Sequence, residues 1–91
     1  MKPTLVLVAD AARPLEALEP AVWGAAAGGW ERIAIDIDGL ACFGDPDVRE
    51  LIRLLRIARD AGTDVALHVG SPDRRRALSD MGLDRVFAIV A

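Results

Sequence analysis

The sequence predicts an α/β domain with a mostly parallel central sheet of about four strands and three helices. Two observations predict this class. Short apolar segments typical of strands alternate with longer segments in which apolar residues recur at helical spacing, and proline, acidic residues and glycine mark the helix ends. The chain has 91 residues, of which 53% are hydrophobic and 27% charged, so we expect one domain over residues 1–91.

The first half of the chain predicts a strand, a helix and a second strand. Residues 5–9 form an unbroken apolar run, which is typical of a strand covered on both faces. A helix is expected from Pro14 to Gly28 and Gly29, because proline fits a first helical turn and glycine fits the residue after a helix. Isoleucine occupies every second position of residues 32–38, which predicts a strand with one strongly apolar face.

The second helix has the clearest sequence boundaries. Asp45 fits the N-cap position, because its carboxylate can accept a hydrogen bond from a free backbone N–H. Pro46 fits the first helical position, because proline lacks the backbone N–H that would be unpaired there. Apolar residues then recur along one face of the predicted helix: Val48, Leu51, Ile52, Leu55 and Ala58. Gly62 is expected to follow its last turn.

The remaining residues predict a strand, a short helix and a last strand. Residues 65–69 are an apolar run of strand length. Ser71, followed by a proline and an aspartate, is expected to cap a short helix that ends at Gly82. The last strand is expected over residues 85–90, so strands and helices alternate along the whole chain.

Charge and composition narrow the class of protein. The formal net charge of −3 argues against a nucleic-acid partner, which would require a basic surplus. The apolar runs are shorter than the ~20 residues of a membrane helix, so we expect neither membrane insertion nor a signal peptide. The single cysteine, Cys42, excludes an internal disulfide and is expected to pack as a small apolar residue; it fits a cytoplasmic location.

The end of the second strand carries a pair of aspartates, Asp36 and Asp38, before Gly39. Two carboxylates at a strand end can act as nucleophile and general acid or base in phosphoryl transfer. The motif resembles motif I of the haloacid-dehalogenase phosphatases and implies a minimal phosphatase using these two residues. That family also uses a later lysine, whereas the only lysine here is Lys2. The alternative interpretation is that both aspartates are polar residues at a strand end.

A longer stretch resembles the STAS domain, which is shared by bacterial anti-sigma factor antagonists and sulfate-transporter tails. The segments that carry the resemblance occur in register: Ile33–Gly39, Leu54–Arg56, Val65–Leu67, Ser71–Pro72 and Gly82–Phe87. In that family a serine at the start of the second helix is phosphorylated by a partner kinase. The family's serine motif falls here on Gly44, Asp45, Pro46 and Asp47, so Asp45 and Pro46 form a degenerate phosphosite that lacks the serine.

The resemblance implies a non-catalytic protein-interaction module that regulates transcription and binds no cofactor or metal. The partner would be an anti-sigma factor kinase or, alternatively, the ATPase subunit of an ABC-type transporter. The expected partner-binding residues are Phe43, Gly44, Asp45, Pro46, Asp47 and Val48. Asp45 and Asp47 fix the negative charge that other members add by phosphorylation, or Asp45 serves only as a helix cap. An edge strand of the family is missing here, so a homodimer through an exposed sheet edge is also possible.

Other polar and aromatic residues have simpler interpretations. His68 lies inside a predicted strand with no second metal ligand at a suitable sequence spacing, so we interpret it as a residue at the core edge. The arginines of residues 74–76 are expected on a solvated helix face. Trp23 and Trp30 flank a glycine-rich helix end, where either could be an exposed contact residue.

Overall fold

A computed structural model describes residues 2–90 of the chain. The strands are β1 (Lys2–Asp10), β2 (Trp30–Gly39), β3 (Asp64–His68) and β4 (Ala88–Val90). The helices are α1 (Glu19–Ala27), α2 (Asp45–Asp60) and α3 (Pro72–Asp80), with short 3-10 helices η1 (Leu15–Leu18) and η2 (Leu83–Arg85). The four strands are parallel and lie in the order β1-β2-β3-β4. The predicted α/β class, with its parallel sheet and three helices, is confirmed.

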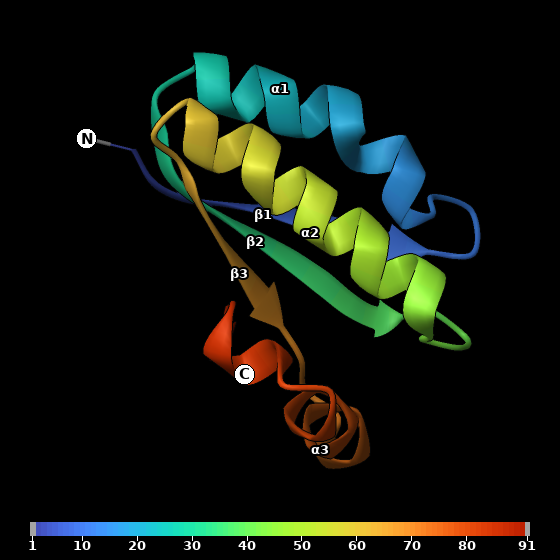
Figure 1. The fold of residues 1–91 in the computed structure, drawn as a ribbon. Helices are drawn as coiled ribbons and strands as arrows, with labels where there is room; N and C mark the ends of the chain where they lie inside the picture. The colour runs from blue at the N-terminus through green and yellow to red at the C-terminus, as the bar shows by residue number, and fades with distance from the viewer. Residues whose placement is uncertain (1, 91) are drawn as a thin grey trace.

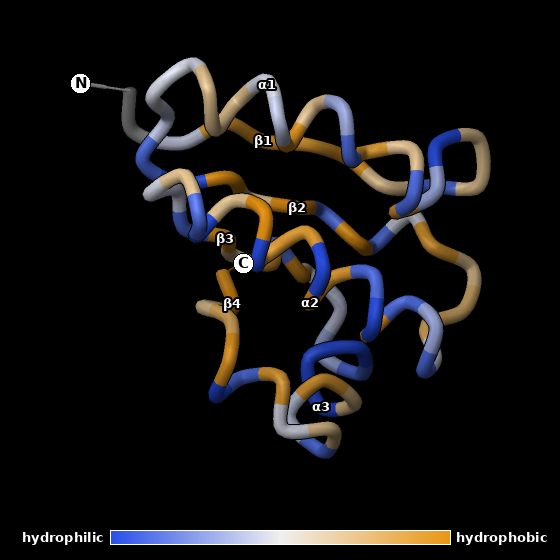
Figure 2. Tube along the Cα trace, turned by 45° about the horizontal axis from the view of Figure 1, so that its top comes forward, coloured by the Kyte–Doolittle hydropathy of each residue, from blue (hydrophilic) through white to orange (hydrophobic). Residues whose placement is uncertain are grey.

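The helices α1 and α2 lie side by side over one face of the sheet (Figure 1). Right-handed crossovers between neighbouring strands taken in order place successive helices on the same face. On that face the side chains of Ile33, Ile35 and Ile37 are fully buried. Figure 2 shows apolar residues along β1 and β2. The aliphatic core therefore sits between the sheet and these two helices.

The first strand differs from its prediction. Val6 is 56% exposed and Val8 is 47% exposed, whereas Leu5 and Leu7 pack against the core. The sequence predicted a strand covered on both faces. Because β1 lies at the edge of the sheet and α1 and α2 cover only one face, alternate residues of this apolar run point away from the helices.

Two further element boundaries are corrected. The helix expected from Pro14 is divided into η1 and α1, because Pro20 would clash with the carbonyl of residue 16 in a continuous α-helix. The strand expected over residues 85–90 is only Ala88–Val90. The preceding residues form η2, and the backbone N–H of Phe87 donates to the carbonyl of Leu83 at 2.9 Å, so that donor is used locally.

Other predicted helix ends are confirmed. Gly62 follows the last residues of α2 with φ of 85°, a left-handed conformation that glycine adopts without steric cost. Gly82 has φ of 77° after α3. At the other end of α3, the Ser71 hydroxyl accepts a hydrogen bond from the backbone N–H of Arg74 at 3.3 Å.

An ion-pair network joins α1 to α2 on the solvent side. The Nε of Arg53 donates to Glu50 Oε2 at 2.9 Å, and its guanidinium also pairs with Glu19 of α1. The hydrogen bond to Glu50, followed by the one to Glu19, raises the pKa of Arg53 above its ordinary value. The ion pair between Arg53 and Glu19 links α2 to α1, and α2 begins at the predicted partner-binding residues.

Candidate functional site

The first candidate site is the loop before α2 together with its first turn. The N-cap residue is Gly44, which is extended, and not Asp45 as the sequence predicted. The carboxylate of Asp47 accepts a hydrogen bond from the backbone N–H of Gly44 at 2.9 Å, while the carbonyl of Gly44 accepts one from the N–H of Asp47 at 3.0 Å. Asp45 and Pro46 are therefore the first and second helical residues, and Asp47 supplies the cap contact.

The six predicted partner-binding residues form one continuous surface. Asp45 and Pro46 are exposed, whereas Phe43, Gly44, Asp47 and Val48 are half-buried. The side chains of Phe43 and Val48 pack against the edge of the core. None of the ion pairs among the side chains of residues 4–90 involves Asp45. The surface thus combines an exposed carboxylate, available to a partner, with two apolar side chains.

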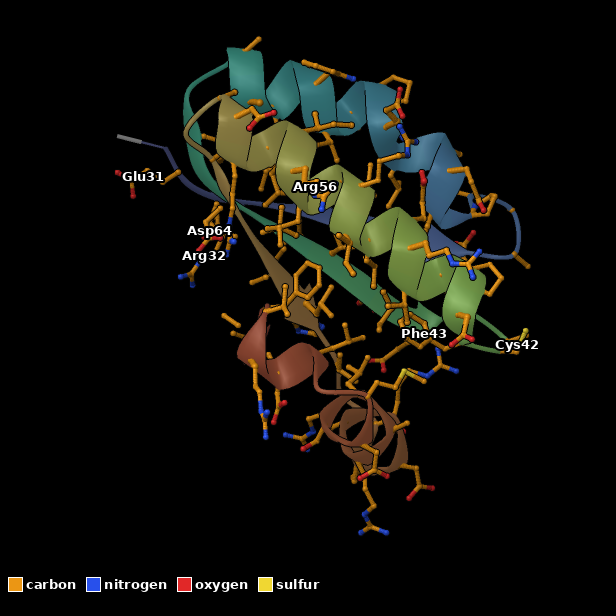
Figure 3. All side chains as sticks on the ribbon, viewed as in Figure 1. Glu31, Arg32, Cys42, Phe43, Arg56 and Asp64 are labelled. Atoms are coloured by element: carbon orange, nitrogen blue, oxygen red, sulfur yellow. The ribbon has the colours of Figure 1, made fainter. Side chains whose placement is uncertain are left out.

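One expectation about the loop before α2 is wrong. Cys42, expected to pack as a small apolar residue, is exposed in the loop next to Phe43 (Figure 3). The neighbouring Leu40 is buried and takes the core position. The opposite ends of β2 and β3 carry Glu31, Arg32 and Asp64, away from this loop (Figure 3).

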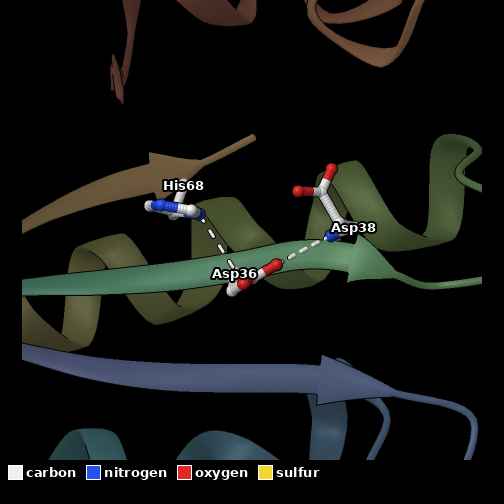
Figure 4. Close-up of side chains that lie close together, drawn as sticks. All are labelled: Asp36, Asp38 and His68. Atoms are coloured by element: carbon white, nitrogen blue, oxygen red, sulfur yellow. Dashed lines mark hydrogen bonds and ion pairs between the residues drawn. The ribbon is translucent and has the colours of Figure 1, made fainter. Parts of the chain in front are cut away.

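The second candidate site is a cluster of Asp36, Asp38 and His68 on the carboxyl-terminal halves of β2 and β3. Asp36 lies directly beside His68 in the parallel register, and the distance from its Oδ2 to His68 Nδ1 is 3.6 Å. One ligand atom of each residue lies within 4.8 Å of those of the other two. Figure 4 shows the three side chains on the face of the sheet turned away from α2. The structure thus gives His68 the neighbours that the sequence spacing did not reveal.

Asp38 has a structural contact of its own. Its Oδ2 accepts a hydrogen bond from the backbone N–H of Gly70 at 2.7 Å, and its Oδ1 accepts one from the N–H of Ser71 at 3.4 Å. The carboxylate therefore fastens the end of β2 to the start of α3. Asp38 is thus a polar residue at a strand end, which agrees with the second of the two sequence interpretations, and the backbone N–H groups of Gly70 and Ser71 are its partners.

The arginines of α3 divide into two groups. Arg75 and Arg76 are exposed, as expected for a solvated face. Arg74 is half-buried, and its Nη1 donates to the carbonyl of Ile37 at 2.7 Å. This hydrogen bond is a second link between α3 and the end of β2.

The remaining exposed features concern the sheet edge and the tryptophans. In the order of the sheet, β1 pairs only with β2, so its other edge is unpaired within residues 2–90. The expected homodimer through such an edge stays a prediction. Trp23 is 54% exposed, as expected, whereas Trp30 is half-buried; a contact role for Trp23 stays a prediction.

No family model matches the chain, and no curated protein matches it. No helix within residues 2–90 is long and apolar enough to span a membrane. The same part of the chain encloses no detected pocket.

Proposed function

We propose that the chain is a non-catalytic protein-interaction module of the STAS type, an anti-sigma factor antagonist-like regulator that serine phosphorylation cannot switch. One observation carries the proposal. Asp45 is exposed on the first turn of α2, at the first of the two serine positions in the motif of the resemblance, and the half-buried apolar residues Phe43 and Val48 are near it in sequence.

The cap geometry favours a role for Asp45 beyond the helix end. Asp47, and not Asp45, accepts the hydrogen bond from the N-cap residue. Removing Asp45 would leave that contact in place. Its carboxylate still gains from the helix dipole, which favours negative charge in the first turn. A fixed negative charge at the first serine position of the motif, without the cap contact, supports the mimic over the simple cap.

The partner we propose is an anti-sigma factor kinase in the cytoplasm; the alternative is the ATPase subunit of an ABC-type transporter. Either would need a basic group for Asp45 and an apolar surface for Phe43 and Val48. A second copy could also pair along the free edge of β1 without covering this surface, because β1 and α2 lie in different layers.

The test measures binding of the purified kinase and of the transporter ATPase from the source organism to immobilised protein. The variant Asp45→Arg with Val48→Glu should weaken capture of one of them at least tenfold. The matched control, Asp60→Arg with Val86→Glu, makes the same chemical changes at exposed positions outside the surface and should bind normally. Equal binding by the two double variants, or binding of neither protein, would reject the proposal.

A second arm tests the missing phosphosite. Asp45→Ser restores a hydroxyl at the first of the two serine positions of the family's motif. If the kinase docks as proposed, it should phosphorylate this variant in the presence of ATP and leave the unmodified protein unlabelled. Binding of the kinase without labelling of Asp45→Ser would show that Asp45 does not occupy the serine position.

A further inference from the structure

We propose that Asp36, Asp38 and His68 bind a divalent transition-metal ion of the Zn²⁺ class on the sheet face turned away from α2. The three residues supply two carboxylates and one imidazole, a ligand set that zinc accepts in proteins. The site is separate from the surface at the start of α2, and the inference does not depend on the proposed function.

The parallel sheet explains why the ligands converge. Directly paired residues of adjacent parallel strands share a face, and Asp36 is paired with His68. Asp38, two residues further along β2, lies on the same face as Asp36 (Figure 4). The three ligands are therefore side chains of two central strands, and their relative positions follow from the pairing of those strands.

The imidazole provides the observation that points to a ligand. The Nδ1 atom of His68 is buried and has no hydrogen-bond partner, although the ring as a whole is 38% exposed. It faces Asp36 Oδ2 at 3.6 Å, which is too long for a hydrogen bond. Two ligand atoms roughly 2.0–2.1 Å from a tetrahedral zinc ion lie about 3.4 Å apart. The separation of these two atoms is thus close to the one that a shared ion would require.

The carboxylates are already oriented by other groups. Asp36 Oδ1 accepts a hydrogen bond from the backbone N–H of Asp38 at 3.0 Å, which leaves Oδ2 facing His68. The backbone N–H of Gly70 holds Asp38 Oδ2 at 2.7 Å. Ligating carboxylates in metal sites are commonly hydrogen-bonded in this way. Only small side-chain rotations would bring the three ligand atoms, now within 4.8 Å, onto one ion.

The local charge favours a cation. With a neutral imidazole the cluster carries two negative charges, and among the side chains of residues 4–90 no arginine forms an ion pair with either carboxylate. Arg74 uses its Nη1 for the carbonyl of Ile37 instead. His68 and the 27% exposed Asp36 leave solvent access, so an ion could enter and keep a water ligand.

The test is calorimetric titration of the tag-free protein with ZnCl₂, in a Cys42→Ser background because the exposed thiol is itself a zinc ligand. One Zn²⁺ should bind per chain. Asp36→Asn and His68→Gln should each lower the affinity roughly tenfold or more, since even indirect supports of a metal site cost about that much. Asp60→Asn removes the same charge from the exposed end of α2 and should leave the affinity unchanged.

Two outcomes would overturn the proposal: no saturable binding of Zn²⁺, or binding that Asp36→Asn and His68→Gln weaken no more than Asp60→Asn does. Circular dichroism checks that each variant is folded. A second measurement needs no substitution at the site, because His68 is the only histidine. Its ring nitrogens give unique ¹⁵N signals, and Zn²⁺ should shift the Nδ1 signal; an unchanged Nδ1 signal at saturating Zn²⁺ would also reject the site.

Discussion

A matched pair of valines tests the one-sided covering of the sheet. Val65 of β3 faces the helices and is 1% exposed, whereas Val6 of β1 lies on the other face and is 56% exposed. The change to alanine removes the same atoms in both places, and both residues lie in strands. The difference between the two losses in unfolding free energy therefore reports burial more than strand propensity.

The magnitude follows from the exposed fractions. Valine to alanine removes two carbon groups, worth about 0.8 kcal/mol each when fully buried. For Val65→Ala the transfer loss is then about 1.6 kcal/mol, and the cavity left between sheet and helices raises the cost to about 2–3 kcal/mol. Val6 has a little under half of its surface buried, so Val6→Ala should cost about 0.7 kcal/mol. We expect the two variants to differ by about 1.5–2 kcal/mol.

Equilibrium unfolding in urea measures this difference, with tryptophan fluorescence and circular dichroism as two probes that should give one transition. Trp23 and Trp30 supply the fluorescence. Equal losses for the two variants would refute the reasoning, because Val6 would then be as buried in solution as Val65. If the loss at Val6 rose with protein concentration, a second copy of the chain would be the cover.

Three further predictions concern the helix ends and the aspartate pair. Asp47→Ala should cost about 1 kcal/mol in urea unfolding by removing the contact with the N-cap N–H, and Asp45→Ala about half as much, since it loses only the dipole interaction; the reverse order would contradict the cap assignment. Gly62→Ala should lower the free energy of unfolding by about 1–2 kcal/mol, because the backbone of Gly62 has a positive φ. Gly24 lies within α1, and nothing lies within 4 Å of the carbon that Gly24→Ala would add, so this variant should raise the free energy of unfolding by about 0.5–1 kcal/mol. Thermal unfolding should show a lower midpoint for the first variant and a higher one for the second. We expect no magnesium-dependent hydrolysis of an aryl phosphate, and hydrolysis that Asp36→Asn abolished would restore the phosphatase interpretation.

The class and order of the elements were predictable because the apolar periodicity separates strands from helices, and because local residues mark helix ends. Ser71 and Gly62 are local signals, satisfied by neighbouring backbone groups, and both predictions are confirmed. The exposed face of β1 was missed because an unbroken apolar run looks the same whether one face or both are covered. The break in the first helix was predictable from Pro20, because proline destabilises a helix interior through its own ring and its missing N–H, whatever the tertiary structure around it.

The candidate sites were predictable to different degrees. The surface at the start of α2 is contiguous in sequence, so its residues could be named together, although the cap contact belongs to Asp47 and not to Asp45. The cluster with His68 joins residues 32 positions apart along the chain, and only the register of β2 against β3 brings them together. A shift of one residue in that register would place His68 on the core face. No sequence spacing could have distinguished the two cases.

The two candidate sites lie towards the same end of the sheet but are linked to different helices. Both lie towards the carboxyl end of the sheet, where the chain leaves β2 for α2 and β3 for α3. The hydrogen bonds of the Asp38 carboxylate lead to Gly70 and Ser71, and hence to the start of α3. The cap of α2 is closed by the reciprocal hydrogen bonds between Gly44 and Asp47, which involve no residue of the cluster. An ion bound to the cluster would therefore act on α3, while a partner at Asp45 would act on α2, so loss of one site should leave the other working.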